Sequence, residues 1–475
     1  MSQKIVIIGA GPGGYVAALR AAALGADVTL VEKEHVGGTC LNWGCIPSKI
    51  MKTTADLVLK FKDAESYGIT CPGSPVTDMS RLMLRKKRII ETQRQGIHAL
   101  LKKSSVRFMS GRGYVKGSSM ASVVSDTGNE TDVPFDKLIL ATGTEPLNLP
   151  AFPFDGRVIL SSNHLLSLDT LPRSMVIVGG GVIGCEFAFI LNAFGTTVTV
   201  VEAMDRLLPL DSVDDACSKV LLREMKKSKI TCITNRAVTR TEKHGDRLKV
   251  FVGGSPFDNQ RDLVKEQVLD VETMAVCIGR SPLSRSLGLE NLGLETDPRG
   301  WIPVNASMET SVPGVYAIGD ILGPQRVMLA HVASHEGMVA AQNAMGMATI
   351  MHYDAIPGAV FTMPEIGDVG LTEKQALAKG IDAQCTTVQF RALGKAQAMG
   401  EIAGEGKVVS HRETGKILGV HLIGPHATDL IAEGALAVRN GLSLWQVAET
   451  IHAHPTLAEI MGEISFKGTG RAIHG

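Results

Sequence analysis

The sequence predicts an α/β protein in which two units, each made of a strand, a glycine loop, a helix and a second strand, are followed by a C-terminal α+β region. An apolar run leads straight into a glycine-rich loop after Lys4 and again after Met175, and beyond Pro357 the pattern changes to a series of strands and then helices. Continuous apolar runs of this kind are typical of parallel strands that are buried on both faces. We expect four parts, at residues 1–150, 151–280, 281–350 and 351–475.

The composition narrows the class of protein. The formal net charge is zero, so the chain offers no strong electrostatic field to nucleic acid or to an anionic membrane. Its 51 glycines and its aromatic content of only 4% suit layered sheets with tight turns. The 8 cysteines are scattered and lack the density of a secreted disulfide scaffold. With neither a cleavable leader nor an apolar run of bilayer length in view, we expect a cytoplasmic protein, and no metal site is predicted.

The first glycine unit has every part of a dinucleotide-binding, Rossmann-like fingerprint. Gly9-Ala10-Gly11-Pro12-Gly13-Gly14 follows the first apolar run, a helix is expected at 15–24, and the strand at 27–32 ends in Glu32. In one unit of about thirty residues this combination is a strong signal, whereas a glycine loop alone is weak. The glycines let the backbone approach a pyrophosphate at the helix N-terminus, and Glu32 can bind an adenosine ribose. The alternative is a βαβ unit that binds nothing.

The second unit repeats the first. A glycine loop at 179–184 precedes a helix expected at 185–194, and the next strand ends in Glu202. Two complete loops argue for two different dinucleotides. The carboxylate of Glu202 would repel a ribose 2′-phosphate, so this unit is expected to prefer NAD to NADP. Glu186 lies early on the helix, where it is either an ordinary surface acid or a partner for Lys49.

Between the two units lies a stretch with redox character, from Gly37 to Lys49, that contains Cys40 and Cys45. If these cysteines form a disulfide, a regular helix cannot connect them, and Gly44 supplies the backbone freedom for a distortion. Pro47 fits best in a first helical turn, which places Cys45 near a helix N-terminus that favours a thiolate. A disulfide in so small a loop would exchange readily. The alternative is that both cysteines are small buried hydrophobes.

Three further stretches stand out. Ala141-Thr142-Gly143 ends an apolar strand and fits a chain that crosses close to a bound dinucleotide. A strand that ends at Gly319-Asp320 is followed by Met328-Leu329-Ala330-His331, which opens a helix that runs to about residue 345. Near the C-terminus, His454 is followed by Pro455 and then by Glu459, an arrangement that suits a general base with its orienting acid. The alternative for His454 and its neighbour His452 is a pair of surface histidines on a loop.

Together these motifs resemble the pyridine nucleotide–disulfide oxidoreductases, the glutathione-reductase-like flavoenzymes. The resemblance runs from residue 4 to about residue 474 and is carried by Gly-Gly-Thr-Cys40-x4-Cys45-Ile-Pro-Ser-Lys49, both glycine loops, Tyr-Ala-Ile-Gly-Asp320 and His454-Pro-Thr-x-x-Glu459. Within the family the chain is most similar to the branch that oxidises the dihydrolipoyl groups of 2-oxo acid dehydrogenase and glycine cleavage complexes. The stretch 328–331, Glu202 and a C-terminus without a further cysteine pair favour that branch. Trp43 and the tail at 466–475 are less easily matched.

The resemblance implies an FAD domain at 1–150, an NAD domain at 151–280, a central portion at 281–350 that completes the FAD site, and a dimerisation domain at 351–475. It implies one non-covalent FAD per chain, NAD⁺/NADH as substrate, and a homodimer in which His454 and Glu459 act on the disulfide of the partner subunit. The expected partners are the lipoyl domains of E2 or the glycine cleavage H protein, with no nucleic acid and no membrane.

The residues expected to act or bind fall into three groups. The catalytic group is Cys40, Cys45, Lys49, Glu186, His454 and Glu459. The FAD group is Gly9, Gly11, Gly14, Glu32, Lys33, Gly38, Thr39, Lys49, Gly113, Ala141, Thr142, Gly143, Asp320, Met328, Leu329, Ala330 and His331. The NAD group is Gly179, Gly181, Val182, Ile183, Gly184, Glu186, Glu202, Val238 and Gly279.

Two alternatives stay open. One is a related flavin enzyme that acts on another thiol, or a soluble transhydrogenase, although transhydrogenase relatives lack the full cysteine pair. The other is an FAD- and NAD-binding redox sensor without turnover. The sequence does not distinguish among the complexes that the protein would serve, and it leaves open the physiological direction, the sensitivity to NADH, the flavin potential and the docking surface for E2.

Overall fold

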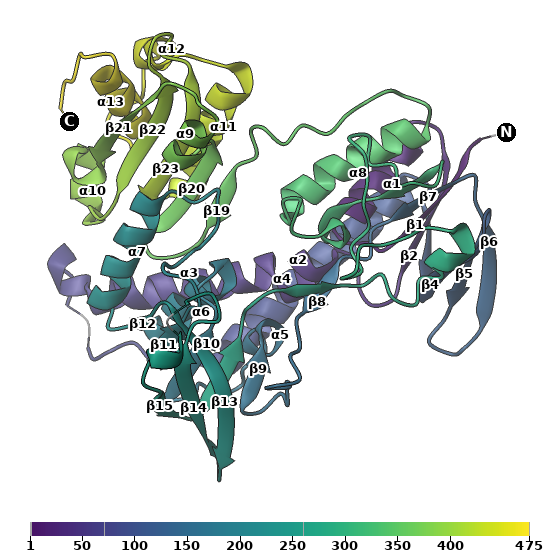
Figure 1. The fold of residues 1–475 in the computed structure, drawn as a ribbon, viewed down its shortest axis with the longest axis horizontal. Helices are drawn as coiled ribbons and strands as arrows, with labels where there is room; N and C mark the ends of the chain where they lie inside the picture. Colours follow the sequence, from purple (N-terminus) through teal and green to yellow (C-terminus); the bar gives the residue numbers. More distant parts are fainter. Residues whose placement is uncertain (1, 71, 260, 475) are drawn as a thin grey trace.

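The structure, a computed structural model, describes residues 2–70, 72–259 and 261–474, so Cys71 lies outside the described residues. Figure 1 shows three regions, each built around its own five-stranded sheet. The N-terminal sheet lies at one end, the sheet of the second glycine unit lies below, and the C-terminal sheet lies at the other end. Within the described ranges, no helix is both long enough and apolar enough to cross a membrane.

The N-terminal sheet is parallel and is completed by a strand from late in the chain. Its order is β18-β7-β1-β2-β3, and its strands pair in parallel register. The helix α1 follows β1 and packs beside α8, where a side chain on Gly337 would come within 2.4 Å of the Gly13 carbonyl oxygen. The bounds are β1 Lys4–Ile8, α1 Pro12–Ala23, β2 Asp27–Glu32, β3 Arg107–Ser110, β7 Lys137–Leu140, β18 Val315–Ala317 and α8 Ala330–Ala344.

The second sheet has the same plan. Its order is β12-β11-β10-β16-β9, with β10 at the position that β1 holds in the first sheet. Each of the two sheets is accompanied by a three-stranded antiparallel sheet, β4-β5-β6 for the first and β13-β14-β15 for the second. The bounds are β4 Arg112–Gly117, β5 Met120–Val124, β6 Glu130–Pro134, β9 Ile159–Ser161, α5 Ser162–Leu165, β10 Ser174–Val178, α6 Val182–Ala193, β11 Thr197–Val201, α7 Asp215–Lys227, β12 Thr231–Ile233, β13 Arg236–His244, β14 Arg247–Gly254, β15 Gln267–Val271 and β16 Thr273–Val276.

The C-terminal sheet is antiparallel, in the order β19-β20-β23-β22-β21. One face packs on α11 and α13 around a core that includes Val408, Val420 and Leu422, and α7 of the second unit also contacts β23. The helices expected after the strands of this region are confirmed as α11 and α12. The bounds are β19 Gly358–Val360, β20 Glu365–Gly370, α9 Glu373–Ala378, β21 Ala383–Gln389, α10 Gly394–Met399, β22 Glu405–His411, β23 Ile417–Gly424, α11 Ala427–Asn440, α12 Leu444–Glu449 and α13 Glu459–Gly468.

Three helices and a strand pair connect these regions. The long α3 and α4 run through the middle of the molecule (Figure 1), and α3 packs on α6 of the second unit. The short α2 precedes α3, and the pair β8 and β17 joins the first region to the segment that follows the second. The bounds are α2 Gly38–Trp43, α3 Cys45–Lys62, α4 Met79–Lys103, β8 Thr144–Pro146 and β17 Arg280–Pro282.

The expected starts of the two nucleotide helices, at residues 15 and 185, are wrong by one turn. Both helices begin earlier, at Pro12 and Val182. The last glycine of each loop already lies inside the helix, where a side chain on Gly14 would fall 1.8 Å from the Gly9 carbonyl oxygen and one on Gly184 would fall 1.9 Å from that of Gly179. The helix can therefore start directly above the strand end, because nothing larger than hydrogen is present at the crossing.

Candidate active site

The two cysteines of the redox stretch face each other across a break between helices. Helix α2 ends at Trp43 and α3 begins at Cys45, so Gly44 alone forms the corner. A side chain on Gly44 would come within 3.0 Å of the Thr39 carbonyl oxygen, which explains the glycine. Cys40 and Cys45 are free thiols, both partly buried, and they hydrogen-bond to each other. The backbone therefore has the corner that a disulfide between them requires.

The two thiols are electrostatically unequal. The hydrogen bond donated by Cys40 lowers the pKa of Cys45, and the positive charge of Lys49 lowers it further, against the opposing effect of burial. The same hydrogen bond, with burial, raises the pKa of Cys40. Cys45 also begins α3, where the helix dipole favours an anion. Cys45 is therefore the thiolate of the pair and the better leaving group.

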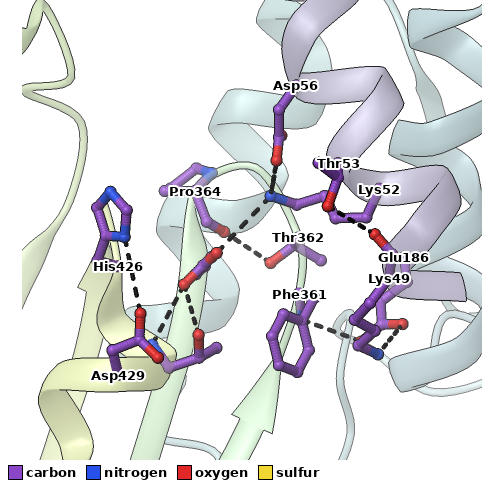
Figure 2. A network of polar contacts seen from close by, with 12 residues as sticks. Lys49, Lys52, Thr53, Asp56, Glu186, Phe361, Thr362, Pro364, His426 and Asp429 are labelled. Carbon is purple, nitrogen blue, oxygen red and sulfur yellow. Dashed lines mark hydrogen bonds and ion pairs between the residues drawn. The ribbon is translucent and has the colours of Figure 1, made fainter. Parts of the chain in front are cut away.

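Lys49 is held by an ion pair that links three parts of the fold, as Figure 2 shows. Its Nζ lies 2.9 Å and 3.1 Å from the two carboxylate oxygens of Glu186 on α6. Glu186 also accepts a hydrogen bond of 3.0 Å from the Phe361 backbone N–H, and the Lys49 Nζ lies 4.1 Å from the centre of the Phe361 ring. The carboxylate is buried, so Glu186 is the partner of Lys49 and not a surface acid.

A cavity of about 550 Å³ opens beside the cysteines, within the range usual for ligand sites. Its wall combines the first glycine loop, the redox stretch, the crossing at 141–143, Asp320 and the start of α8. The predicted FAD residues on its wall are Gly9, Gly11, Glu32, Lys33, Gly38, Thr39, Gly113, Ala141, Thr142, Gly143, Asp320, Met328, Leu329 and Ala330.

Three residues predicted for FAD lie elsewhere. Gly14 lies behind the loop, under Gly9, and Lys49 is paired with Glu186. The Nε2 atom of His331 lies 3.0 Å from the Pro357 carbonyl oxygen, so this ring is engaged with the segment before β19. For these three residues a direct contact with FAD stays a prediction.

The wall of the cavity fits the expected FAD. Neither α1 nor α8 has a side-chain cap at its start, so the amides of two helix N-termini are left for a pyrophosphate and a ring carbonyl. Gly9 has φ of 105°, and a side chain there would meet the Ala141 carbonyl oxygen at 2.3 Å. The segment at 141–143 therefore crosses the first glycine loop so closely that only glycine fits. Asp320 is partly buried, which raises its pKa, and its carboxylate can accept from a hydroxyl.

The sequence reasoning missed Arg280. This side chain lines the cavity and donates to the Thr144 hydroxyl at 2.6 Å and to the Thr144 carbonyl at 2.8 Å. Its Nε lies 4.0 Å from Asp320, whose negative charge it supports against the cost of burial. The only sequence signal was its position after the apolar strand at 271–279, and linear spacing does not connect it to Asp320.

The second glycine loop repeats the geometry of the first. Glu32 accepts from the Ala10 and Glu34 backbone amides at 2.7 Å and 2.9 Å. Glu202 accepts from those of Gly180 and Met204 at 2.6 Å and 2.7 Å. In both units the terminal acid is therefore oriented by the loop that it serves.

The remaining NAD residues lie around this second loop, with one exception. Gly179 has φ of 103° and abuts the Cys277 carbonyl oxygen, as Gly9 abuts that of Ala141. Gly181 caps α6, Val182, Ile183 and Gly184 form its first turn, and Gly279 follows β16 with φ of 139°. Val238 is buried in the apolar core beside β14, so its contact with NAD stays a prediction.

The candidate base and its acid are paired at the start of α13. The Nδ1 atom of His454 lies 2.8 Å from Glu459 Oε1, and Glu459 Oε2 accepts from the Thr456 amide at 2.9 Å. Burial opposes the shift, but these two hydrogen bonds lower the pKa of Glu459. The His454 side chain is 74% exposed, and α13, which contains Glu459, lies far from α2 in the same chain (Figure 1). Within one subunit the pair does not reach the cysteines.

Known proteins resemble this chain along its whole length. Residues 3–337 match the family model described as pyridine nucleotide-disulphide oxidoreductase, and residues 356–464 match the dimerisation domain of the same family. The chain is 40% identical to the dihydrolipoyl dehydrogenase of Chlamydia pneumoniae, over 100% of this chain and 99% of that protein. It is 39% identical to a dihydrolipoyl dehydrogenase of Bacillus subtilis, over 99% and 98%. The crystal structure of LpdA from Mycobacterium tuberculosis superposes with a TM-score of 0.89 at 27% identity, over 98% and 99%.

Proposed function

The chain belongs to the pyridine nucleotide-disulphide oxidoreductase family, and on that basis we propose that it is a dihydrolipoyl dehydrogenase, the E3 enzyme that oxidises protein-bound dihydrolipoamide and reduces NAD⁺. The observation that carries the proposal is the unequal cysteine pair at the end of a dinucleotide cavity. Full-length similarity to dihydrolipoyl dehydrogenases of several species supports the same activity. The protein is an oxidoreductase that uses FAD and NAD(H).

The chain's own residues divide the work of holding the two nucleotides. We assign FAD to the first glycine loop, Glu32, Asp320 and the N-terminus of α8, all on the cavity wall. Bound there, FAD supplies two-electron transfer between the cysteines and the nicotinamide. NAD⁺ is assigned to the second loop, where the carboxylate of Glu202 binds ribose hydroxyls and repels a 2′-phosphate.

The cysteines carry the thiol chemistry. In the oxidised enzyme Cys40 and Cys45 form a disulfide, and a substrate thiolate attacks Cys40 Sγ so that the bond to Cys45 breaks. Cys45 leaves as a thiolate because its pKa is lowered. The second substrate sulfur then attacks the substrate sulfur of the mixed disulfide and releases Cys40, which yields the cyclic lipoyl disulfide and a dithiol enzyme.

His454 moves the protons. Its Nε2 atom takes a proton from the substrate dithiol, while Glu459 at Nδ1 fixes the tautomer and stabilises the imidazolium. The dimerisation domain makes the protein a homodimer, and we assign the action of His454 and Glu459 to the disulfide of the other subunit. A monomer would then lack a complete site.

Three assignments accompany this function. The protein partners are the lipoyl domains of E2 or the glycine cleavage H protein, which carry the dithiol. We keep the domain boundaries at residues 150, 280 and 350. The third part, residues 281–350, supplies β18 to the sheet of the first part, as expected of a segment that completes the FAD site. A cytoplasmic location is favoured by the cysteines, which are scattered and lack the density of a secreted disulfide scaffold.

An anaerobic titration of the purified yellow protein with dihydrolipoamide tests the proposal. We expect a long-wavelength absorption band at two-electron reduction, because Cys45 lines the cavity that would hold FAD and its thiolate would donate charge to an oxidised flavin there. NAD⁺ should discharge the band and NADP⁺ should not. A spectrum that dihydrolipoamide leaves unchanged while another dithiol or NADPH alters it would assign the chain to a different member of the family.

A further inference from the structure

A second histidine–carboxylate pair lies two residues before His454. The Nε2 atom of His452 lies 2.9 Å from Glu433 Oε1 on α11. The His452 side chain is only 10% exposed, whereas that of His454 is 74% exposed. The two histidines of this loop therefore differ: one is embedded and the other is presented to solvent. The mechanism above uses only the exposed one.

The His452 ring is fixed on three sides. Glu433 holds Nε2 from α11, and the Thr450 backbone, just after α12, accepts a further hydrogen bond from the ring. On the third side the ring packs on α13 at Gly462, where a side chain would come within 3.0 Å of Nδ1. Gly462 lies one turn after Glu459, so His452 ties the loop that carries His454 to both helices around it.

These contacts favour a charged ring. The hydrogen bond that the ring donates to the Glu433 carboxylate is the main cause that raises the pKa of His452, and the negative charge of Glu459 on α13 adds to it, against partial burial. In return, the positive charge of His452 helps to lower the pKa of Glu459. Glu463, the next acid on α13, is engaged elsewhere, with His474 at 2.8 Å. The cation of His452 therefore acts on the Glu459 carboxylate that orients the base.

We propose that His452 is a positioning residue for the reaction: as a cation fixed between α11 and α13, it shares Glu459 with His454 and weakens the hold of His454 on its proton. A second positive charge near an imidazolium disfavours the imidazolium, since like charges repel. His454 then stays neutral, and able to accept a proton, at a lower pH than its carboxylate partner alone would allow. The inference rests on the proposed function, because it gives His454 the role of base.

The test is the pH dependence of kcat/KM for dihydrolipoamide in three variants. His452→Gln keeps a hydrogen-bond donor toward Glu433 and loses the charge, so the midpoint of the acid limb should rise by roughly half a pH unit. Glu433→Gln removes the carboxylate that favours the charged ring and should raise the midpoint in the same direction by less. His474→Gln removes the matched pair farther along α13 and should leave the midpoint unchanged.

Two outcomes separate the inference from the proposed function. If His452→Gln lowers kcat but leaves the midpoint where it is, His452 is a packing residue and the inference is wrong. If His454→Gln retains full activity, the assignment of the base is wrong, whatever His452 does. Should His452→Gln fail to bind FAD or to dimerise, Glu433→Gln decides by the same midpoint. A pH titration of the long-wavelength absorbance of the reduced protein gives a readout without turnover, and its midpoint should move with that of kcat/KM.

Discussion

The two glycine units of this protein share their strands, loop, helix and terminal acid, yet their surroundings differ. Around the first unit, α8, the turn at Asp320 and the redox stretch close a cavity of about 550 Å³. The second unit packs its helix α6 on α3, and none of its loop residues lies on the wall of that cavity. The same local sequence pattern can thus hold a resident cofactor when later segments cover it and an exchangeable substrate when they do not.

An ion pair joins the redox stretch to the second unit. Glu186, one turn into α6, holds Lys49 of the redox helix. The helix that starts at the second glycine loop therefore orients the cation beside Cys45. Through this contact, the second unit fixes the position of a charged side chain in the redox stretch.

The largest effect is expected from a change in the cysteine pair, which lies beside the first unit and has no counterpart beside the second. Cys45→Ser should lower dihydrolipoamide oxidation on the order of a thousandfold or more, because the leaving thiolate is lost. FAD content, measured by absorbance, should stay normal. Cys385→Ser, at an exposed cysteine on β21, is the control and should leave turnover intact. Substantial turnover in Cys45→Ser would favour the redox-sensor alternative.

The next prediction concerns nucleotide binding by each glycine unit separately. Gly9→Ala places a methyl group 2.3 Å from the Ala141 carbonyl oxygen, and Gly179→Ala places one 2.5 Å from that of Cys277. Gly9→Ala should yield protein without bound FAD. Gly179→Ala should stay yellow with a KM for NAD⁺ raised about tenfold or more, since both changes strain a backbone at positive φ.

The control for this pair comes from the turns that end the two helices. Gly25 and Gly195 also have positive φ, at 90° and 109°, but a side chain there would meet nothing within 4 Å. Alanine at either position should cost only about 1 kcal/mol of stability, measured by thermal unfolding, and should spare both nucleotides. If Gly9→Ala and Gly179→Ala lose the same nucleotide, the assignment of one nucleotide to each unit is wrong.

A smaller effect concerns the terminal acids. Glu202→Gln should reduce the preference for NAD⁺ over NADP⁺, as a ratio of kcat/KM values, by about tenfold, the effect of losing one charge-assisted hydrogen bond and the repulsion of a phosphate. Glu32→Gln, its counterpart, should weaken FAD binding and leave that ratio unchanged. An unchanged preference in Glu202→Gln would place the selectivity elsewhere in the second unit.

The last prediction concerns α8, which covers the first unit, and it is measured as stability and not as turnover. Glu336 on α8 accepts from the Gly319 amide at 2.7 Å and from the Tyr353 hydroxyl at 2.6 Å, and burial raises its pKa from 4.5 to about 7. The folded protein therefore holds this proton more tightly than the unfolded chain. The resulting stabilisation is complete below about pH 4.5 and is lost as the pH rises through about 7, on the order of 3 kcal/mol in all.

Thermal unfolding between pH 5 and pH 8 measures this contribution. Glu336→Gln should lose that part of the pH dependence, so its difference from the wild-type protein should change sign or shrink as the pH rises. Asp368→Asn is the matched control in the C-terminal sheet, because burial raises the pKa of Asp368 to about 7 as well. Asp368→Asn should lose a similar component of the pH dependence of unfolding. Parallel curves for wild type and Glu336→Gln would contradict the role of burial at this carboxylate.

Much of the fold was predictable because its signals are local. The glycine loops, the acids Glu32 and Glu202, and the corner at Gly44 each depend on neighbours within a few residues of the chain. The errors are local too: both nucleotide helices start one turn earlier than expected, because Gly14 and Gly184 look like loop residues in the sequence and are helical in the structure.

The two glycine units, the cysteine pair and the histidine–glutamate motif can be read from the chain without a structure, since each is a short pattern whose spacing is set by backbone geometry. How these parts act on one another depends on the packed fold. Lys49 meets Glu186 and Phe361, Arg280 supports Asp320, and His452 lies between α11 and α13. These contacts join residues that are distant along the chain, and their strength depends on burial and charge, which exist only once the sheets have packed.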